Sequence, residues 1–273
     1  MLIGIYANPE RDVGLVFARK LAGELEKAGA EYVVHDSVLG VFGKARGFGD
    51  DCKPRPDMIV SLGGDGTILS AIAFAAPEGI PVMGVNLGGM GFLTAVTADD
   101  NAAKETVRII MSGNYTVSER AMLEARAAGR KFFAINEVVF YKRSLGKTVD
   151  VSVRVGDSHV ANYKADGFIV GTPTGSTGWA LSVGGPIVCP DIPCLLLLPM
   201  NCHQLSARPV IASDKQPVIV AGSEPGSIIA DGNVVAGDAQ EMTVVRAPFN
   251  AKLVTCDDFG FYGRLNRKLG LAK

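Results

Sequence analysis

The sequence has 273 residues, 48% hydrophobic and 20% charged, which is typical of a globular protein with one large or two moderate domains. Its formal net charge of −1 gives no bulk attraction to nucleic acid or anionic membranes, so we expect neither as a partner. The apolar runs at residues 2–6 and 194–200 are too short for a signal peptide or a membrane helix, so we expect a cytoplasmic protein.

The first 112 residues alternate between strand and helix patterns. We expect strands at residues 2–6, 31–35, 58–62 and 80–86, and helices at 11–28, from about 68 onward, and at 99–112. This order predicts β-α-β units with right-handed crossovers and therefore a parallel sheet. Residues 37–56 are rich in glycine and proline, and they are expected to form a loop with little structure, either a lid or variable surface.

A glycine-rich turn links the strand at 58–62 to the helix after it, and it consists of Gly63, Gly64, Asp65, Gly66 and Thr67. Glycines allow close backbone approach, so free N–H groups at the helix start can face a phosphate. An acid at such a site suits a group that binds a metal ion or accepts a proton during phosphoryl transfer. The alternative is a tight turn that Asp65 caps.

A second glycine turn, residues 87–94, follows the strand at 80–86. Ligands of open α/β sheets bind at the carboxyl ends of the strands, so two glycine turns at that edge favour a binding site there.

From residue 113 to about 254 the pattern changes to short alternating strands, which predicts a mostly β second domain. Strands are expected at 122–127, 131–141, 149–155, 168–170, 216–220 and 242–246, and Asp231-Gly232 predicts a hairpin between 227–230 and 233–236. We expect a helix or extended segment at 259–269. The predicted domains are residues 1–112, with 255–273 packing back on them, and residues 113–254.

Two stretches of the second domain are candidate ligand sites. Asn136 and Glu137 interrupt an apolar strand and could hydrogen-bond a ribose or an adenine, or one of them could face solvent. Residues 172–177 place hydroxyls and glycine before a short helix, where a phosphate or sugar could bind or the residues could only cap the helix. Trp179 could stack on a base or fill the core.

Several other classes of protein find no support. The first strand is not followed by G-x-G-x-x-G, Gly146-Lys147-Thr148 lacks the first glycine of a phosphate-binding P-loop, and no Gly-x-Ser-x-Gly elbow occurs. Five cysteines do not indicate a disulfide framework. A zinc site is disfavoured because its candidate ligands lack paired C-x-x-C spacing; they are Cys189, Cys194, Cys202 and His203.

Together these stretches resemble the NAD kinase family from the first strand to the C-terminal segment. Gly63-Gly-Asp-Gly-Thr67 is shared with diacylglycerol and sphingosine kinases and, in a variant form, with phosphofructokinases. Four further stretches resemble NAD kinase motifs in their expected order: residues 84–94, Asn136-Glu137, residues 172–179 and Ser206-Ala-Arg-Pro209.

The resemblance implies transfer of the terminal phosphate of ATP, or of inorganic polyphosphate, to the 2′-hydroxyl of the adenosine ribose of NAD. It also implies Mg²⁺ or another divalent ion, with no protein ligand to the metal assigned, and a homodimer or homotetramer. A non-catalytic NAD or NADP sensor and, less favoured, a lipid kinase remain as alternatives.

By the same resemblance Asp65 is the proton acceptor, and Gly63, Gly64, Gly66 and Thr67 bind the ligand beside it. The positions that match those holding NAD are Asn136, Glu137, Lys164, Asp166, Thr177, Gly178, Trp179, Ala180, Leu181 and Ser182, whereas Lys147 and Asn233 match weakly. The family usually has Ala-Tyr in place of Gly178-Trp179 and glutamine in place of Asn233.

Overall fold

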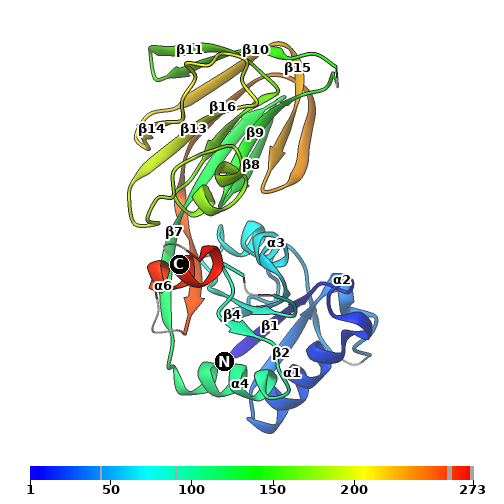
Figure 1. Ribbon diagram of the computed structural model, residues 1–273. Coiled ribbons are helices and arrows are strands. Elements are labelled where there is room, and N and C mark those ends of the chain that lie inside the picture. The colour runs from blue at the N-terminus through cyan, green and yellow to red at the C-terminus, as the bar shows by residue number, and fades with distance from the viewer. Residues whose placement is uncertain (44, 90, 145, 257–259, 271–273) are drawn as a thin grey trace. The chain divides into compact units, whose positions relative to one another are not determined.

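The computed structural model describes residues 1–43, 45–89, 91–144, 146–256 and 260–270 (Figure 1). The chain divides into two compact units, which are residues 1–119 with 250–273 (unit 1) and residues 120–249 (unit 2). The expected boundaries were 112/113 and 254/255. The observed boundaries lie within two long strands, β7 and β16, so each of these strands contributes residues to both units.

Unit 1 is an α/β domain built on a parallel sheet with the strand order β5-β4-β1-β2-β3. Its elements before β7 are β1 Leu2–Ala7, the 3₁₀ turn η1 Val13–Leu15, α1 Val16–Lys27, β2 Glu31–His35, α2 Asp36–Leu39, β3 Gly47–Phe48, β4 Met58–Gly63, α3 Asp65–Ala75, β5 Val82–Asn86, β6 Val96–Thr97 and α4 Ala102–Ser112. The predicted parallel sheet is therefore confirmed.

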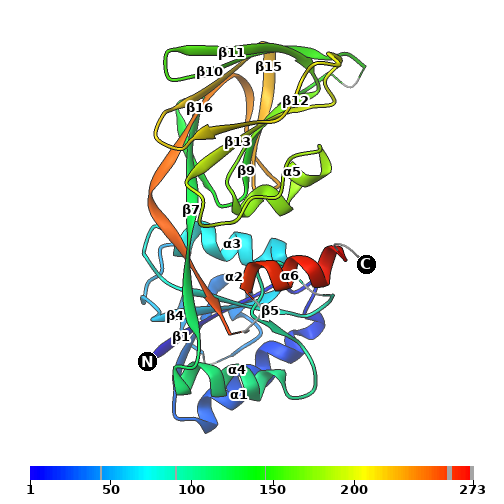
Figure 2. The same ribbon diagram turned by 60° about the vertical axis from the view of Figure 1, so that its left-hand side comes forward.

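The sheet of unit 1 is covered by helices on both faces. Strand β4 is buried along its whole length, which explains its uninterrupted apolar sequence. Helices α1 and α4 share one hydrophobic core with β1, β4 and β5, and α3 lies on the opposite face (Figures 1 and 2). Because β4 and β5 are parallel neighbours, their carboxyl ends and the glycine turns that follow them lie at the same edge of the sheet.

One expectation for unit 1 is wrong. The first long helix begins at Val16 instead of residue 11, because the Asp12 carboxylate accepts the N–H groups of Phe17 and Ala18 at 2.9 and 2.8 Å and so caps it. The described part of residues 37–56 has little regular structure, as expected, since it contains the end of α2 and the two-residue strand β3, which pairs with β2. The Phe48 side chain is fully buried there.

Unit 2 is formed almost entirely of antiparallel strands around one main core. The elements from β7 to the C-terminus are β7 Thr116–Ala127, β8 Arg130–Ala134, β9 Glu137–Lys142, β10 Val149–Val155, β11 Ser158–Ala165, β12 Gly167–Gly171, η2 Thr174–Thr177, α5 Trp179–Ser182, β13 Cys194–Met200, β14 Val210–Ser213, β15 Val218–Ala230, β16 Asn233–Thr255 and α6 Gly260–Leu269. The predicted mostly β fold of this region is confirmed.

The predicted hairpin at Asp231-Gly232 joins β15 to β16, and both turn residues have positive φ (45° and 83°). The single strand expected at 131–141 is instead two strands, β8 and β9, with a break at residues 135–136. Strands β11 and β14 were not anticipated.

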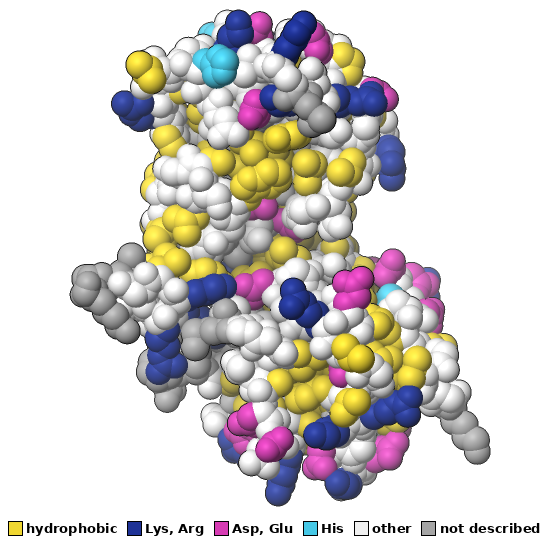
Figure 3. Space-filling view, turned by 45° about the vertical axis from the view of Figure 1, so that its right-hand side comes forward, with side chains coloured by type: hydrophobic (Ala, Val, Ile, Leu, Met, Phe, Trp, Pro, Cys, Tyr) yellow, Lys and Arg dark blue, Asp and Glu magenta, His cyan; other side chains and the backbone are white. Residues whose placement is uncertain are grey.

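Helix α6 belongs to unit 1 and is anchored there by the buried side chain of Leu265. Phe259, the first residue of the segment expected at 259–269, lies outside the described residues. Within the described ranges, no helix combines the length and apolar character needed to cross a membrane. On the face shown in Figure 3, acidic and basic side chains are interspersed on each unit, in keeping with the near-zero net charge.

Candidate active site

A small pocket lies at the carboxyl ends of the central strands of unit 1. Its volume is about 150 Å³, and it is lined by Arg11, Gly63, Gly64, Asp65, Asn86, Gly88 and Gly89. These residues come from the segment after β1, from the β4–α3 turn and from the turn after β5. As expected, the two glycine turns share one site, although Met90 of the second turn lies outside the described residues.

The β4–α3 turn is held closed by Thr67. Its side chain is buried, and Oγ1 accepts the Gly64 N–H and the Asn8 amide, each at 3.4 Å. A Cβ on Gly63 would overlap this side chain, so only glycine fits there. Thr67 therefore shapes the turn, and neither it nor Gly66 is among the residues that line the pocket.

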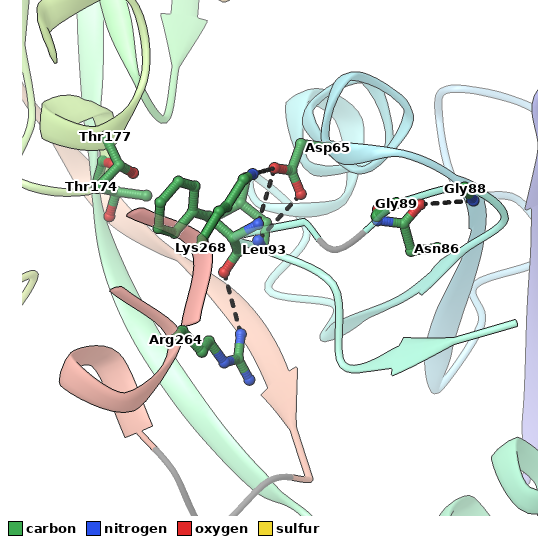
Figure 4. A network of polar contacts seen from close by, with 10 residues as sticks. Asp65, Asn86, Gly88, Gly89, Leu93, Thr174, Thr177, Arg264 and Lys268 are labelled. Atoms are coloured by element: carbon green, nitrogen blue, oxygen red, sulfur yellow. Dashed lines mark hydrogen bonds and ion pairs between the residues drawn. The ribbon is translucent and has the colours of Figure 1, made fainter. Parts of the chain in front are cut away.

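The carboxylate of Asp65 is fixed by the second glycine turn. Oδ2 accepts the Phe92 N–H at 2.9 Å, and Oδ1 accepts the Leu93 N–H at 3.1 Å. Lys268 of α6 places its Nζ 3.4 Å from Oδ2. Figure 4 shows this network.

The turn after β5 is organised by Asn86, whose Oδ1 accepts the Gly88 N–H at 3.0 Å and whose Nδ2 donates to the Gly89 carbonyl. Sequence reasoning did not single out Arg11, Asn86 or Lys268. Asn86 is the last residue of β5 and Arg11 lies shortly after the end of β1, so the strand-end rule could have found them. The link of Lys268 to Asp65 spans 203 positions, and no local signal indicates it.

The family resemblance implies a divalent ion, for which the side chains around the pocket are the candidate ligands. No group of three or more His, Cys, Asp or Glu side chains forms within the described part of the chain. Mg²⁺ is commonly held by one or two carboxylates together with substrate phosphates and water. Asp65 supplies one carboxylate next to the pocket, so these residues fit an ion that arrives with a phosphate ligand. The zinc ligands considered above are likewise not gathered into a cluster.

Unit 2 carries the second candidate site, centred on Asn136, which lies between β8 and β9, and on Glu137, the first residue of β9. The carboxylate of Asp231, from the β15–β16 turn, accepts the N–H groups of Ile135, Asn136 and Glu137 at 2.8, 2.8 and 3.2 Å. Because these three N–H groups donate to a side chain, the strand expected at 131–141 is interrupted here. The sequence marked Asp231 only as a turn residue, so its structural role was missed.

Glu137 is buried and strongly perturbed. Burial, together with the nearby Asp231 carboxylate, raises the pKa of Glu137 to about 8, although the Trp179 backbone N–H partly offsets this. Burial also raises the pKa of Asp231, against the opposing effect of its three backbone donors. Glu137 Oε2 has no hydrogen-bond partner among the described residues. A buried oxygen without a partner is a candidate ligand contact.

Residues 172–182 are tied to the same two residues. The Thr172 N–H donates to the Asn136 carbonyl at 2.8 Å, and a Cβ on Gly175 would overlap that carbonyl. A Cβ on Gly178 would lie 3.1 Å from Glu137 Oε2. The structure thus brings Asn136, Glu137 and Gly178 together.

The remaining residues of this segment have different environments. Trp179 is half-buried and packs at the margin of a core cluster, with its ring 6.3 Å from that of Tyr141. Ala180 is fully buried in that cluster, Thr177 and Leu181 are half-buried, and Ser182 is exposed.

The other predicted ligand residues lie on separate elements. Asp166 follows β11 and accepts from Lys142 at 2.6 Å and from Asn201 at 2.9 Å, which lowers its pKa. Lys164 is exposed on β11, and Lys147 is exposed before β10. The Asn233 amide turns back to the Asp231 carbonyl at 3.4 Å, within its own hairpin.

Comparison with known proteins bears on both units. Residues 3–115 match the family profile of the ATP-NAD kinase N-terminal domain, and residues 135–256 match that of the ATP-NAD kinase C-terminal domain. The chain is 36% identical to an NAD kinase of Symbiobacterium thermophilum over 96% of both chains. It is 40% identical to an NAD kinase of Heliobacterium modesticaldum over 78% of both.

Solved structures agree on the fold. A crystal structure of an NAD kinase from Archaeoglobus fulgidus in complex with ATP superposes with a TM-score of 0.77 at 26% identity, covering 99% of this chain and 98% of that one. Yeast NADH kinase complexed with NADH gives a TM-score of 0.90 at 20% identity, covering 100% of this chain and 88% of that one. On full-length similarity, two matching domain profiles and a common fold, the chain belongs to the NAD kinase family.

Proposed function

We propose that this protein transfers the terminal phosphoryl group of ATP, or of polyphosphate, to the 2′-hydroxyl of the adenosine ribose of NAD. The observation that carries the proposal is the Asp65 carboxylate, which two backbone N–H groups hold beside a pocket made of two glycine turns. The related NAD kinase from Archaeoglobus fulgidus was crystallised with ATP, and yeast NADH kinase with NADH.

In the proposed reaction, Asp65 accepts the proton of the ribose hydroxyl as that oxygen bonds to the transferred phosphorus. The bond from this phosphorus to the bridging oxygen of the donor breaks, and the shortened donor leaves. A divalent ion bound to the donor phosphates would neutralise the negative charge that develops. Backbone N–H groups of the glycine turns and the guanidinium of Arg11 supply further positive charge in the pocket of unit 1.

NAD is proposed to bind to unit 2. Asn136 and Glu137 supply hydrogen-bonding groups, and the unpartnered Glu137 Oε2 supports a ligand contact at this point. Asp166, Lys164 and residues 177–182 complete the proposed surface, on the basis of their match to the family positions. A cytoplasmic homodimer or homotetramer is part of the same proposal.

The direct test is to incubate the purified protein with NAD, ATP and Mg²⁺ and to measure NADP. We expect NADP to form. If neither ATP nor polyphosphate yields NADP while NAD still binds, the protein would instead be a non-catalytic NAD or NADP sensor. Phosphorylation of diacylglycerol in a parallel assay would indicate the lipid kinase alternative.

Asp65→Asn tests the proposed proton acceptor. General-base catalysis typically contributes ~10²–10⁴ in rate, so turnover should fall by at least about a hundredfold. NAD affinity, measured by calorimetry, should stay within about threefold because the proposed NAD contacts lie in unit 2. Turnover equal to that of the wild type would remove Asp65 from the mechanism.

A further inference from the structure

The C-terminal helix α6 contacts the proposed proton acceptor through one of its faces. Arg264 donates to the Phe92 carbonyl at 3.1 Å, and Lys268, one turn later, reaches Asp65 Oδ2 at 3.4 Å (Figure 4). The Lys268 ammonium also lies 4.0 Å from the centroid of the Phe92 ring. The chain end therefore contacts both the catalytic candidate and the glycine turn that holds it.

Fold stability alone does not account for this contact. The side chains of Lys268 and Asp65 are 31% and 30% exposed, and ion pairs that solvent reaches to this extent contribute little to folding. Helix α6 has another anchor, the buried Leu265. A lysine held on a carboxylate at the edge of a ligand pocket has an electrostatic effect on whatever binds there.

The proposed reaction creates a charge problem that Lys268 can solve. A donor phosphate chain brings several negative charges close to the Asp65 carboxylate, and like charges at close range repel. An ammonium group has three N–H donors, so it can contact the carboxylate and still donate to a phosphate oxygen. Its orientation is set in advance by the Phe92 ring and by the helix, which adds to its effect on the transition state.

We propose that Lys268 is a further catalytic residue, which bridges Asp65 and the phosphoryl group during transfer. This inference rests on the proposed function. Lys268 donates hydrogen bonds and transfers no proton, while the hydroxyl proton passes to Asp65 and the bond to the leaving donor oxygen breaks. Its contribution is therefore greatest for the transferring group and smaller for the bound substrates.

The test compares Lys268→Met, Lys268→Arg and Lys104→Met in the full-length protein. Removing one preorganised donor to a developing charge typically lowers turnover by about 10²–10³, so we expect a loss of at least tenfold for Lys268→Met. KM for NAD should change by less than about threefold. Lys268→Arg should recover part of the loss because it keeps the charge. Lys104→Met, the same substitution at an exposed lysine of helix α4 in unit 1, should have turnover within about twofold of the wild type.

A second experiment separates charge from structure. In Lys268→Ala, added ethylammonium should restore part of the turnover, whereas tetramethylammonium, which has no N–H donors, should not. If the role of Lys268 were purely structural, ethylammonium would not restore turnover, and the loss of turnover in Lys268→Ala would be accompanied by a lower melting temperature. Turnover of Lys268→Met within twofold of the wild type, or an equal loss in Lys104→Met, would overturn the proposal.

The failure of the proposed function can be recognised independently. If the wild-type protein forms no NADP, the reaction assigned above is wrong whatever Lys268 does. Binding of inorganic tripolyphosphate in the presence of Mg²⁺ can still be measured by calorimetry. We expect Lys268→Met to weaken that binding at least threefold and Lys104→Met to leave it unchanged. If the wild type and Lys268→Met bound tripolyphosphate with equal affinity, the proposed contact between Lys268 and the phosphate would also be overturned.

Discussion

Glu137 combines a buried carboxylate, a raised pKa and an oxygen without a partner among the described residues. The sequence drew attention to it because a charged residue interrupts an apolar strand. The group that perturbs it, Asp231, is far along the chain, and its three bonds to backbone N–H groups follow only from the folded hairpin. The sequence therefore predicted that Glu137 belongs to a candidate site, but not that Asp231 lies close to it.

The raised pKa of Glu137 makes a prediction about stability. Its folded-state pKa of about 8 lies above the value of the unfolded chain, so the folded protein holds an extra proton between the two values. The contribution of this proton to the free energy of unfolding is therefore fully present below the pKa of the unfolded chain, and it is lost as the pH rises towards 8. Glu137→Gln removes this titration. Between pH 5 and 8.5 the wild type should lose at least about 1.4 kcal/mol more unfolding free energy than Glu137→Gln, the equivalent of one pKa unit.

Urea unfolding of both proteins at the two pH values provides the measurement. Asp231 is present in both proteins, so its own titration largely cancels in the comparison. Parallel pH dependences would mean that Glu137 is ionised in the folded protein across the whole range.

At the scale of elements, the sequence predicted most strands and helices because burial imposes the apolar periods of strands and helices on them. The mistakes occur where a side chain takes backbone N–H groups. Asp12 caps α1 and delays its start, and Asp231 breaks the strand expected at 131–141 into β8 and β9. Such side-chain caps compete with regular backbone pairing, and in a sequence they look like ordinary polar residues.

The turn after β5 offers an element-scale prediction about Asp65. A Cβ on Gly91 would overlap Asp65 Oδ1, whereas a Cβ on Gly89, in the same turn, would meet nothing within 4 Å. Gly91→Ala should therefore push the carboxylate away from the Phe92 and Leu93 N–H groups. Since a small misplacement of a catalytic group can cost about 10²-fold, we expect turnover to fall by at least about tenfold.

Gly89→Ala is the matched control. Gly89 lines the pocket, so this change can raise KM for the donor but should leave the turnover at saturation within about twofold. Steady-state kinetics with varied ATP and a thermal melt of each variant provide the readouts. If both variants have the same turnover, the second glycine turn does not control the position of Asp65.

At the scale of the whole molecule, the sequence indicated two domains, and the boundaries expected at 112/113 and 254/255 lie seven and five residues from those of the two units. Composition changes near residue 113, yet β7 and β16 each run through a boundary between the units as one continuous strand. A strand that serves two units carries no turn or linker signal at the boundary. The proposed donor contacts belong to unit 1 and the proposed NAD contacts to unit 2, so variants of each unit should separate the two binding events.

The surface of unit 2 supports the expected self-association. Strand β14 is at the end of the strand order, and it has exposed side chains at Val210 and Ile211, while the Leu205 side chain before it is 93% exposed. An apolar edge strand without a cover is prone to pair with another chain, and a second copy of this protein would bury it.

We therefore expect the wild-type protein to sediment as a dimer or tetramer at micromolar concentration. Ile211→Glu places a charge on the exposed edge and should shift the protein towards a monomer. Val13→Glu changes an apolar side chain of unit 1 that is 78% exposed, against 55% for Ile211, and it should leave the assembly intact. Sedimentation velocity measures all three, and circular dichroism checks that each variant is folded. A wild-type monomer at these concentrations, or dissociation caused by Val13→Glu alone, would show that the β14 edge is not the surface that joins the subunits.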